Sequence, residues 1–247
     1  GPGPPRVVAG RRAPAPGRPT QDERINPMTT RAASDLHHLS TPRTARYATL
    51  GNPALAQETW IVLHGYGQLA EYFIRPFRAL DDGTRLIAAP EALSRFYLDG
   101  LTEHDRVGAS WMTKADRTRE IADYVRYLDR LYAQLVDDGL PNDAPVHVLG
   151  FSQGTATACR WAALGEARVD RLTLWAGGVP PDLDLDAHQS LFGPLDLTLV
   201  IGTDDEYIPA DRVADEEARL DAHGIPHCTV RFDGGHRIDP DVLADLA

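Results

Sequence analysis

The sequence predicts an α/β protein built around a mostly parallel central sheet. Short apolar runs rich in β-branched residues alternate along the chain with amphipathic stretches at helical spacing. The apolar runs are nearly continuous, which is typical of strands covered on both faces. At 247 residues and 43% hydrophobic content, the chain is also long enough to bury the core of one large domain.

The predicted elements follow one another from residue 59 onward. The predicted strands share short, nearly continuous apolar character and lie at 59–63, 85–89, 146–149, 172–175, 197–201 and 229–232. Residues 116–138 carry the clearest helical periodicity, and Gly139 ends that run. Weaker helical patterns cover 69–80, 153–165, 209–223 and 240–246. Strands that alternate with helices in this way predict helices on both faces of the sheet.

Residues 1–30 differ in composition from the rest of the chain. Residues 1–30 are rich in Pro, Gly and Arg and show no apolar periodicity, so we predict a disordered extension or an artefact such as a tag remnant or an overextended reading frame. They contain no apolar core of a secretory signal. Residues 43–247 are predicted to form a single domain.

Charge and composition exclude several classes of function. The net charge is −11, with about +4 on residues 1–31 and about −15 on the remainder, so the body should repel nucleic acid and anionic lipid surfaces. No run approaches the ~20 apolar residues that span a bilayer, and no integral membrane association is expected. Cys159 and Cys228 are too few for a disulfide framework, and a cytoplasmic location is the default expectation. Lys114 is the only lysine, which fits adaptation to high salt and a GC-rich genome equally well.

The motif most informative about function is Gly150-Phe151-Ser152-Gln153-Gly154. It follows a predicted strand and precedes a predicted helix, the context in which a G-x-S-x-G serine occupies a tight turn and projects its hydroxyl. A serine hydroxyl is a weak nucleophile. It therefore requires a base, an acid that orients the base, and donors for the developing oxyanion.

The partners of such a serine should follow it in the order acid, then histidine. Of the three downstream histidines, we choose His236, because it follows the last predicted strand and two glycines on a loop at the catalytic edge. The acid lies in Asp204-Asp205-Glu206 after the strand at 197–201, and chemistry alone does not select among these three carboxylates. An early loop, His64-Gly65-Tyr66-Gly67, can turn an amide toward the serine, and the amide of Gln153 should be the second oxyanion donor.

Together these motifs resemble the phospholipase/carboxylesterase family of α/β-hydrolases, which includes the acyl-protein thioesterases. The resemblance covers about 58–246 and rests on His64–Gly67, the serine pentapeptide, Gly202-x-x-Asp205-x-x-Ile208-Pro209 and Gly235-His236. It implies a catalytic triad of Ser152, Asp205 and His236, with Tyr66 as the first oxyanion donor. The stretch 90–113 departs from the thioesterase pattern and looks more like a bacterial esterase branch.

The expected activity is hydrolysis of small or medium carboxylic esters through an acyl-enzyme, without cofactor or metal. Thioesterase or lysophospholipase activity is the alternative enzymatic function, and a non-catalytic binding module is the alternative of another class.

Trp111, Phe151 and Trp175 are candidates for an acyl pocket, with core packing as the competing interpretation. Only about 29 residues separate Trp175 from Asp205, so no large cap domain is expected. His64 has no partner at metal-ligand spacing and is predicted to be a structural loop residue. The ester or thioester preference, the acyl chain and the oligomeric state stay open.

Overall fold

The computed structural model describes residues 1, 3, 34–100 and 103–247. The chain divides into two units, Gly1–Pro42 and Arg43–Ala247. The described residues of the first unit form no helix or strand, whereas the second unit contains every assigned element. The predicted disorder of residues 1–30 falls almost wholly outside the described residues.

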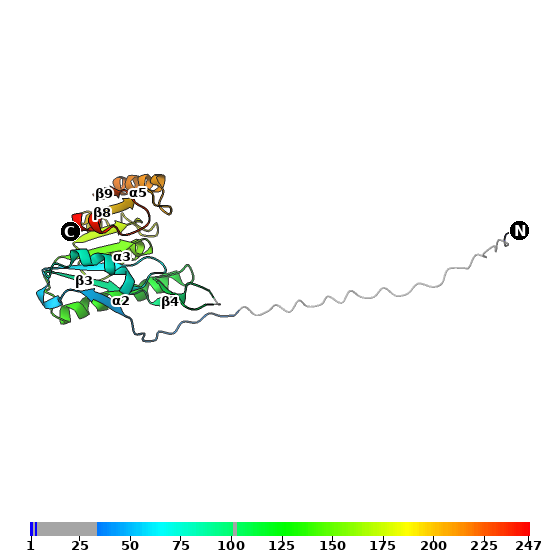
Figure 1. The fold of residues 1–247 in the computed structure, drawn as a ribbon, viewed down its shortest axis with the longest axis horizontal. Coiled ribbons are helices and arrows are strands. Elements are labelled where there is room, and N and C mark those ends of the chain that lie inside the picture. Colours follow the sequence, from blue (N-terminus) through cyan, green and yellow to red (C-terminus); the bar gives the residue numbers. More distant parts are fainter. Residues whose placement is uncertain (2, 4–33, 101–102) are drawn as a thin grey trace. The chain divides into compact units, whose positions relative to one another are not determined.

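The second unit is organised around a seven-stranded sheet in the order β1-β3-β2-β6-β7-β8-β9 (Figure 1). Its strands are β1 (Tyr47–Leu50), β2 (Glu58–Leu63), β3 (Arg85–Pro90), β6 (Val146–Phe151), β7 (Arg171–Trp175), β8 (Asp196–Gly202) and β9 (Cys228–Phe232). Only the edge strand β1 is antiparallel to its neighbour. All six predicted strands and the mostly parallel sheet are therefore confirmed.

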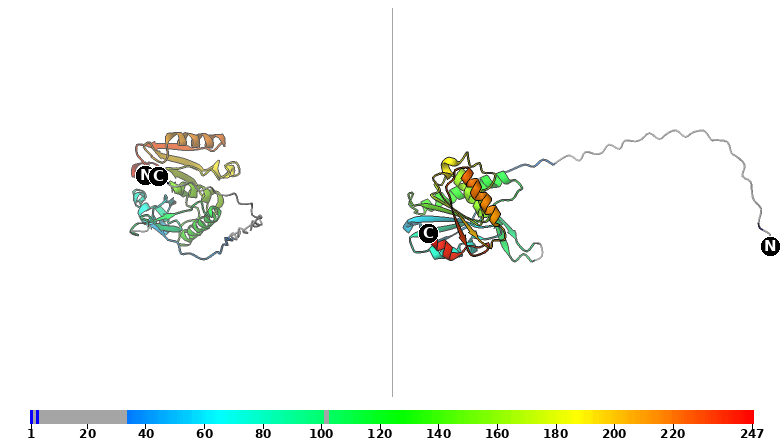
Figure 2. Two further views of the ribbon diagram at one scale, coloured as in Figure 1. Left: turned by 90° about the vertical axis from the view of Figure 1, so that its right-hand side faces the viewer. Right: turned by 90° about the horizontal axis from the view of Figure 1, so that it is seen from above.

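Helices cover both faces of this sheet (Figure 2). The helices are α1 (Ala70–Phe73), α2 (Arg117–Asp137), α3 (Gln153–Leu164), α4 (Gln189–Phe192), α5 (Ala210–Ala222) and α6 (Pro240–Asp245), with 3-10 turns at Pro53–Leu55 and Arg75–Leu80. Apolar residues of α2, α3 and α5 belong to one core cluster, and those of α1 and α6 to the other. Along β2, Ile61 and Leu63 join the first cluster while Trp60 and Val62 join the second. This alternation explains why the strand is apolar throughout.

The segment between β3 and α2 forms a two-stranded antiparallel hairpin instead of a cap domain. Its strands are β4 (Ser94–Tyr97) and β5 (Val107–Ser110). A bridge between Gln68 and Ala109 attaches β5 to the loop after β2. The hairpin is thus tied to the loop in which the first oxyanion donor was predicted.

Candidate active site

Ser152 occupies a strained turn between β6 and α3. Its backbone has φ 54° and ψ −115°, a conformation that costs a non-glycine residue on the order of 1–3 kcal/mol. The turn is held because the amide of Ser152 donates to the carbonyl of Trp175, 2.9 Å away on β7. A Cβ on Gly154 would lie 2.1 Å from the carbonyl oxygen of Leu63, so only glycine lets α3 approach β2 this closely.

Asp205 and His236 meet at the carboxyl ends of β8 and β9. The Nδ1 atom of His236 lies 2.8 Å from Oδ2 of Asp205, and the other oxygen of this carboxylate accepts the amides of Tyr207 and Ile208 at 2.9 and 3.1 Å. The Asp205 side chain is fully buried, whereas Asp204 is exposed. The structure therefore brings Asp205, and not its neighbour, to the histidine.

Two aromatic rings hold the imidazole of His236 in place. Phe151, next to the serine, has its ring centroid 4.9 Å from the imidazole, and Tyr207 makes an edge contact at 4.8 Å. With Nδ1 bonded to Asp205, the ring can turn little, and its Nε2 atom has no hydrogen-bond partner within the described part of the chain. His236 borders the same cavity as Ser152.

Two backbone amides near Ser152 are free to bind an oxyanion. In the loop after β2, the amides of Gly65, Gly67 and Gln68 are each bonded to an oxygen, whereas that of Tyr66 has no such bond within the described part of the chain. Gln153 begins α3, so its amide has no partner in the helix. Both residues line the cavity that contains Ser152.

The side chain of Gln153 has a role that sequence reasoning missed. Its Oε1 accepts the amide of Trp111 at 3.1 Å, and its Nε2 donates to the carbonyl of Met112 at 2.9 Å and the hydroxyl of Ser110 at 3.1 Å. Ala109, one residue earlier, is bonded to Gly67 and Gln68. Gln153 thus connects the start of α3 to the loop of Tyr66 through the end of β5, and so links the two candidate oxyanion donors.

His64 belongs to the scaffold beneath this loop, as predicted. The Nε2 atom accepts the amide of Ala92 at 3.0 Å, so the proton of the neutral ring sits on Nδ1, which donates to the carbonyl of Gly65 at 2.7 Å. Burial of the ring lowers the pKa of His64 and favours this neutral form.

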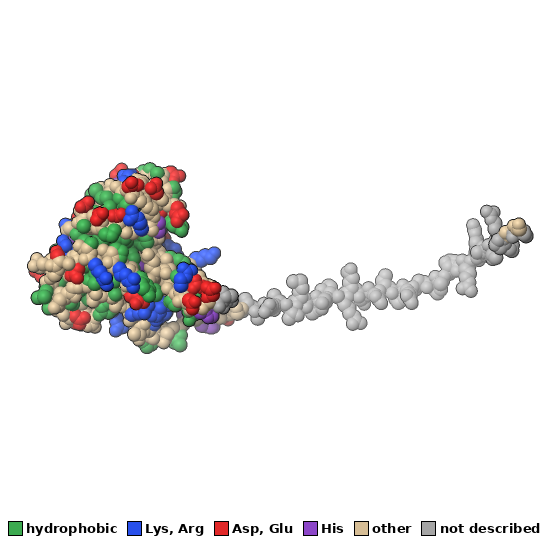
Figure 3. All heavy atoms as spheres, in the orientation of Figure 1, with side chains coloured by type: hydrophobic (Ala, Val, Ile, Leu, Met, Phe, Trp, Pro, Cys, Tyr) green, Lys and Arg blue, Asp and Glu red, His purple; other side chains and the backbone are tan. Residues whose placement is uncertain are grey.

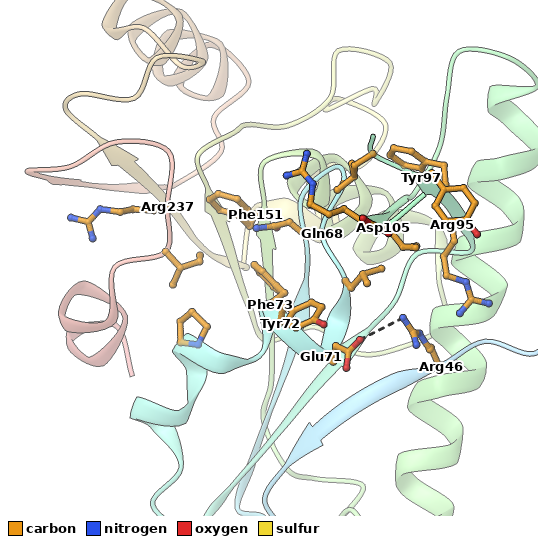
Figure 4. Close-up of a pocket in the computed structure, with 18 of the residues that line it drawn as sticks. Arg46, Gln68, Glu71, Tyr72, Phe73, Arg95, Tyr97, Asp105, Phe151 and Arg237 are labelled. Atoms are coloured by element: carbon orange, nitrogen blue, oxygen red, sulfur yellow. Dashed lines mark ion pairs between the residues drawn. The ribbon is translucent and has the colours of Figure 1, made fainter. Parts of the chain in front are cut away.

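Two cavities meet at His236. The serine cavity, about 690 Å³, is bordered by Ser152, Tyr66, Gln153 and residues of β8 and α5. The hairpin cavity, about 1130 Å³, is bordered by α1, the β4–β5 hairpin and Phe151 (Figure 4). In Figure 4 Phe151 and Phe73 lie between Arg237 at one end and Tyr97 and Arg95 at the other. Ser152 borders the serine cavity and not the hairpin cavity.

The three candidate pocket residues have different positions. Phe151 lines the hairpin cavity beside His236. Trp111 and Trp175 are 2% and 0% exposed, line neither cavity and pack in the core. Their indole N–H groups explain the burial, since each finds a carbonyl acceptor: His64 at 2.8 Å for Trp111, and Arg237 at 2.9 Å for Trp175. An acyl-pocket role for these two tryptophans does not agree with where their side chains lie.

Neither a metal centre nor a membrane span emerges from the described residues. Among 34–100 and 103–247, no group of three or more His, Cys, Asp and Glu side chains is arranged to hold an ion. No helix of the described chain is long and apolar enough to cross a bilayer. On the face drawn in Figure 3, acidic and basic side chains occur together.

Comparison with known proteins identifies the family and agrees with the fold. The model of the phospholipase/carboxylesterase family matches residues 51–247. A Zea mays acyl-protein thioesterase 2 superposes with a TM-score of 0.64 at 18% identity, covering 82% of this chain and 96% of the other. Esterase PE8 gives 0.61 at 20%, covering 83% and 98%, and a Mesorhizobium loti carboxylesterase gives 0.61 at 18%, covering 82% and 93%. At these identities the structural likeness shows the fold alone. No curated protein sequence matches the chain significantly.

Proposed function

Because this chain belongs to the phospholipase/carboxylesterase family and has the α/β-hydrolase fold, we propose that it is a serine hydrolase that cleaves carboxylic esters through an acyl-enzyme. Ser152 is the nucleophile, His236 the general base and acid, and Asp205 the residue that orients the base. The observation that carries the proposal is the 2.8 Å bond between His236 and Asp205, beside the cavity in which the strained Ser152 lies.

In the first half-reaction, Nε2 of His236 removes the hydroxyl proton as Ser152 attacks the ester carbonyl. The carboxylate of Asp205 keeps the proton of the neutral ring on Nδ1 and stabilises the imidazolium that forms. Collapse of the tetrahedral intermediate breaks the ester C–O bond, and His236 donates its proton to the departing alcohol. The acyl group stays on Ser152.

The developing oxyanion accepts hydrogen bonds from the amides of Tyr66 and Gln153. Both are backbone donors, and the connection through the Gln153 side chain fixes their relative position before substrate binds. In the second half-reaction, His236 activates a water that attacks the acyl-enzyme and releases the acid.

The two cavities divide the substrate between them. The oxyanion donors and Ser152 border the serine cavity, so the carbonyl and its acyl chain lie there, against Leu199, Ile201 and Val213. His236 borders both cavities, so the alcohol that it protonates departs toward the hairpin cavity. A cavity of about 690 Å³ without a cap domain suits a small or medium acyl chain.

The test is hydrolysis of p-nitrophenyl esters of increasing acyl length by the wild-type protein and Ser152→Ala. We expect release of p-nitrophenol with an initial burst where deacylation limits turnover, and a loss on the order of 10⁶ in kcat for the variant. Equal rates for the two proteins would refute the proposal.

A thioesterase is the second candidate function. It is favoured by the likeness to the Zea mays acyl-protein thioesterase, and its chemistry uses the same groups. Acyl thioesters assayed beside oxygen esters of the same acyl chain separate the two activities. A non-catalytic binding module would hydrolyse neither substrate.

A further inference from the structure

The serine cavity is bordered by a cationic side chain that ester hydrolysis does not use. Arg212, on the first turn of α5, borders this cavity together with Ser152, Leu199 and Ile201. Within the described part of the chain, its guanidinium has no carboxylate within 4 Å, although Asp215 and Glu216 follow it at helical spacing.

The other arginines that border the two cavities are all neutralised. Those of the hairpin cavity pair as Arg46 with Glu71 and Glu91, Arg95 with Glu91, Arg106 with Asp99, and Arg237 with Asp239. Arg212 is therefore the one cavity arginine, among the residues described, whose charge is left to solvent or ligand.

Helix stability does not explain the position of Arg212. A cation in the first turn of a helix faces the positive end of the helix dipole, which is unfavourable. Glu216, the acid that also borders the cavity, is engaged elsewhere: it accepts the amide of Val179 at 2.7 Å and pairs with Arg219 at 3.3 Å. An anionic ligand near Arg212 would therefore be attracted by the unpaired guanidinium, while the charge of Glu216 is already compensated by Arg219.

From this arrangement we propose that the preferred acyl group carries a carboxylate at the end remote from the ester, as in a half-ester of a dicarboxylic acid. The inference rests on the proposed ester hydrolysis at Ser152. The methylene chain lies against Leu199, Ile201 and Val213, and the terminal carboxylate binds the planar guanidinium of Arg212. Water then supplies the hydroxyl of the second carboxyl group and the proton of the alcohol, so the products are a dicarboxylate and an alcohol.

The experiment compares p-nitrophenyl hydrogen adipate with p-nitrophenyl hexanoate, two esters with the same leaving group and the same acyl length. After correction for spontaneous hydrolysis, wild-type protein should have the higher kcat/KM for the adipate half-ester. Because Arg212 is exposed, Arg212→Gln should lower the adipate-to-hexanoate ratio about 2- to 5-fold, the usual worth of a solvent-exposed ion pair. Arg212→Lys keeps the charge and should retain part of the preference. Added salt should lower the ratio for wild-type protein, because the site is open to solvent.

Arg130→Gln is the matched control, since it removes the same charge from an exposed arginine of α2 that borders neither cavity and, within the described part of the chain, has no ion pair. Its ratio should equal that of the wild type. If wild-type protein hydrolyses the hexanoate but shows no preference for the adipate, or if Arg212→Gln leaves the ratio unchanged, the inference is wrong and the proposed function stands. If neither ester is hydrolysed, the proposed function fails and the inference fails with it.

Discussion

Replacement of Asp205 by asparagine should remove most of the activity without removing the fold. One oxygen of this buried carboxylate accepts two backbone amides, and the other lies 2.8 Å from His236. Asparagine has a single carbonyl oxygen, and the two fixed amides of Tyr207 and Ile208 require it. The NH₂ group then faces Nδ1 of His236 and forces the ring proton onto Nε2.

With that proton on Nε2, His236 cannot accept the proton of Ser152. We therefore expect kcat to fall by ~10⁴, equivalent to ~5.4 kcal/mol of lost transition-state stabilisation. KM should change little, because Asp205 is buried and does not border the serine cavity. The assay is steady-state hydrolysis of a p-nitrophenyl ester, with thermal unfolding to show that the variant is folded.

The matched control is Asp204→Asn, which removes the same charge from the adjacent, exposed position. It should keep kcat within about twofold of wild type, as expected for a surface change away from the site. If Asp205→Asn retains more than about a tenth of the activity, or if Asp204→Asn shows the large loss instead, the tautomer argument is wrong.

Four further predictions follow from particular contacts. Gln153→Leu removes the hydrogen bonds to Trp111, Met112 and Ser110. Because these bonds connect the two oxyanion donors, kcat should fall ~10-fold or more while KM changes little. An equal rise in KM would contradict this. Gly154→Ala should destabilise the fold by at least ~3 kcal/mol, measured by urea unfolding, because a Cβ would lie 2.1 Å from the carbonyl of Leu63; an unchanged midpoint would refute the close approach. Burial, followed by the charge of Arg171, lowers the pKa of His147 to about 4, below its unfolded value near 6.5. The stability that depends on the neutral ring is therefore fully present above pH 6.5, and the free energy of unfolding should fall by ~3 kcal/mol as the pH drops toward 4, if the ring stays buried. The same pH dependence in His147→Gln would show that another group titrates. Iodoacetamide should label the exposed Cys228 in the native protein and spare Cys159, whose pKa burial raises; rapid labelling of Cys159 would show that α3 opens.

Most of the strands that were predicted correctly have a common cause. The strands β2, β3, β6, β7 and β8 lie inside the sheet, so their apolar character is nearly continuous, whereas the edge strand β9 has one buried residue and was predicted from its β-prone sequence. The strands β1, β4 and β5 were not predicted, because they are short and partly exposed. Each has only four residues, and only β1 and β4 alternate, so none could be separated from a loop. A predicted helix at 69–80 is in fact α1 followed by a 3-10 turn, since Pro76 has no amide proton to continue the first helix.

The candidate site residues could be predicted from the sequence because they follow the ends of strands. Ser152, Asp205 and His236 each come directly after a strand, and parallel strands place such residues at one edge of the sheet. The side chain of Gln153 could not be assigned, because its partners lie on a hairpin that was itself not predicted. Trp111 was a candidate for the acyl pocket, but its indole N–H donates to the carbonyl of His64 in the core. Arg212 gave no signal in the sequence, since an exposed arginine on an amphipathic helix is ordinary, and only its place beside the serine cavity distinguishes it.

The central claim is that Ser152 is a nucleophile activated by His236. Its most direct test is incubation of the folded protein with a fluorophosphonate, followed by intact mass measurement and peptide mapping. We predict one adduct per chain, on Ser152, absent from Ser152→Ala and formed far more slowly by His236→Ala. Folded protein that forms no adduct, or an adduct that persists in Ser152→Ala, would contradict the claim.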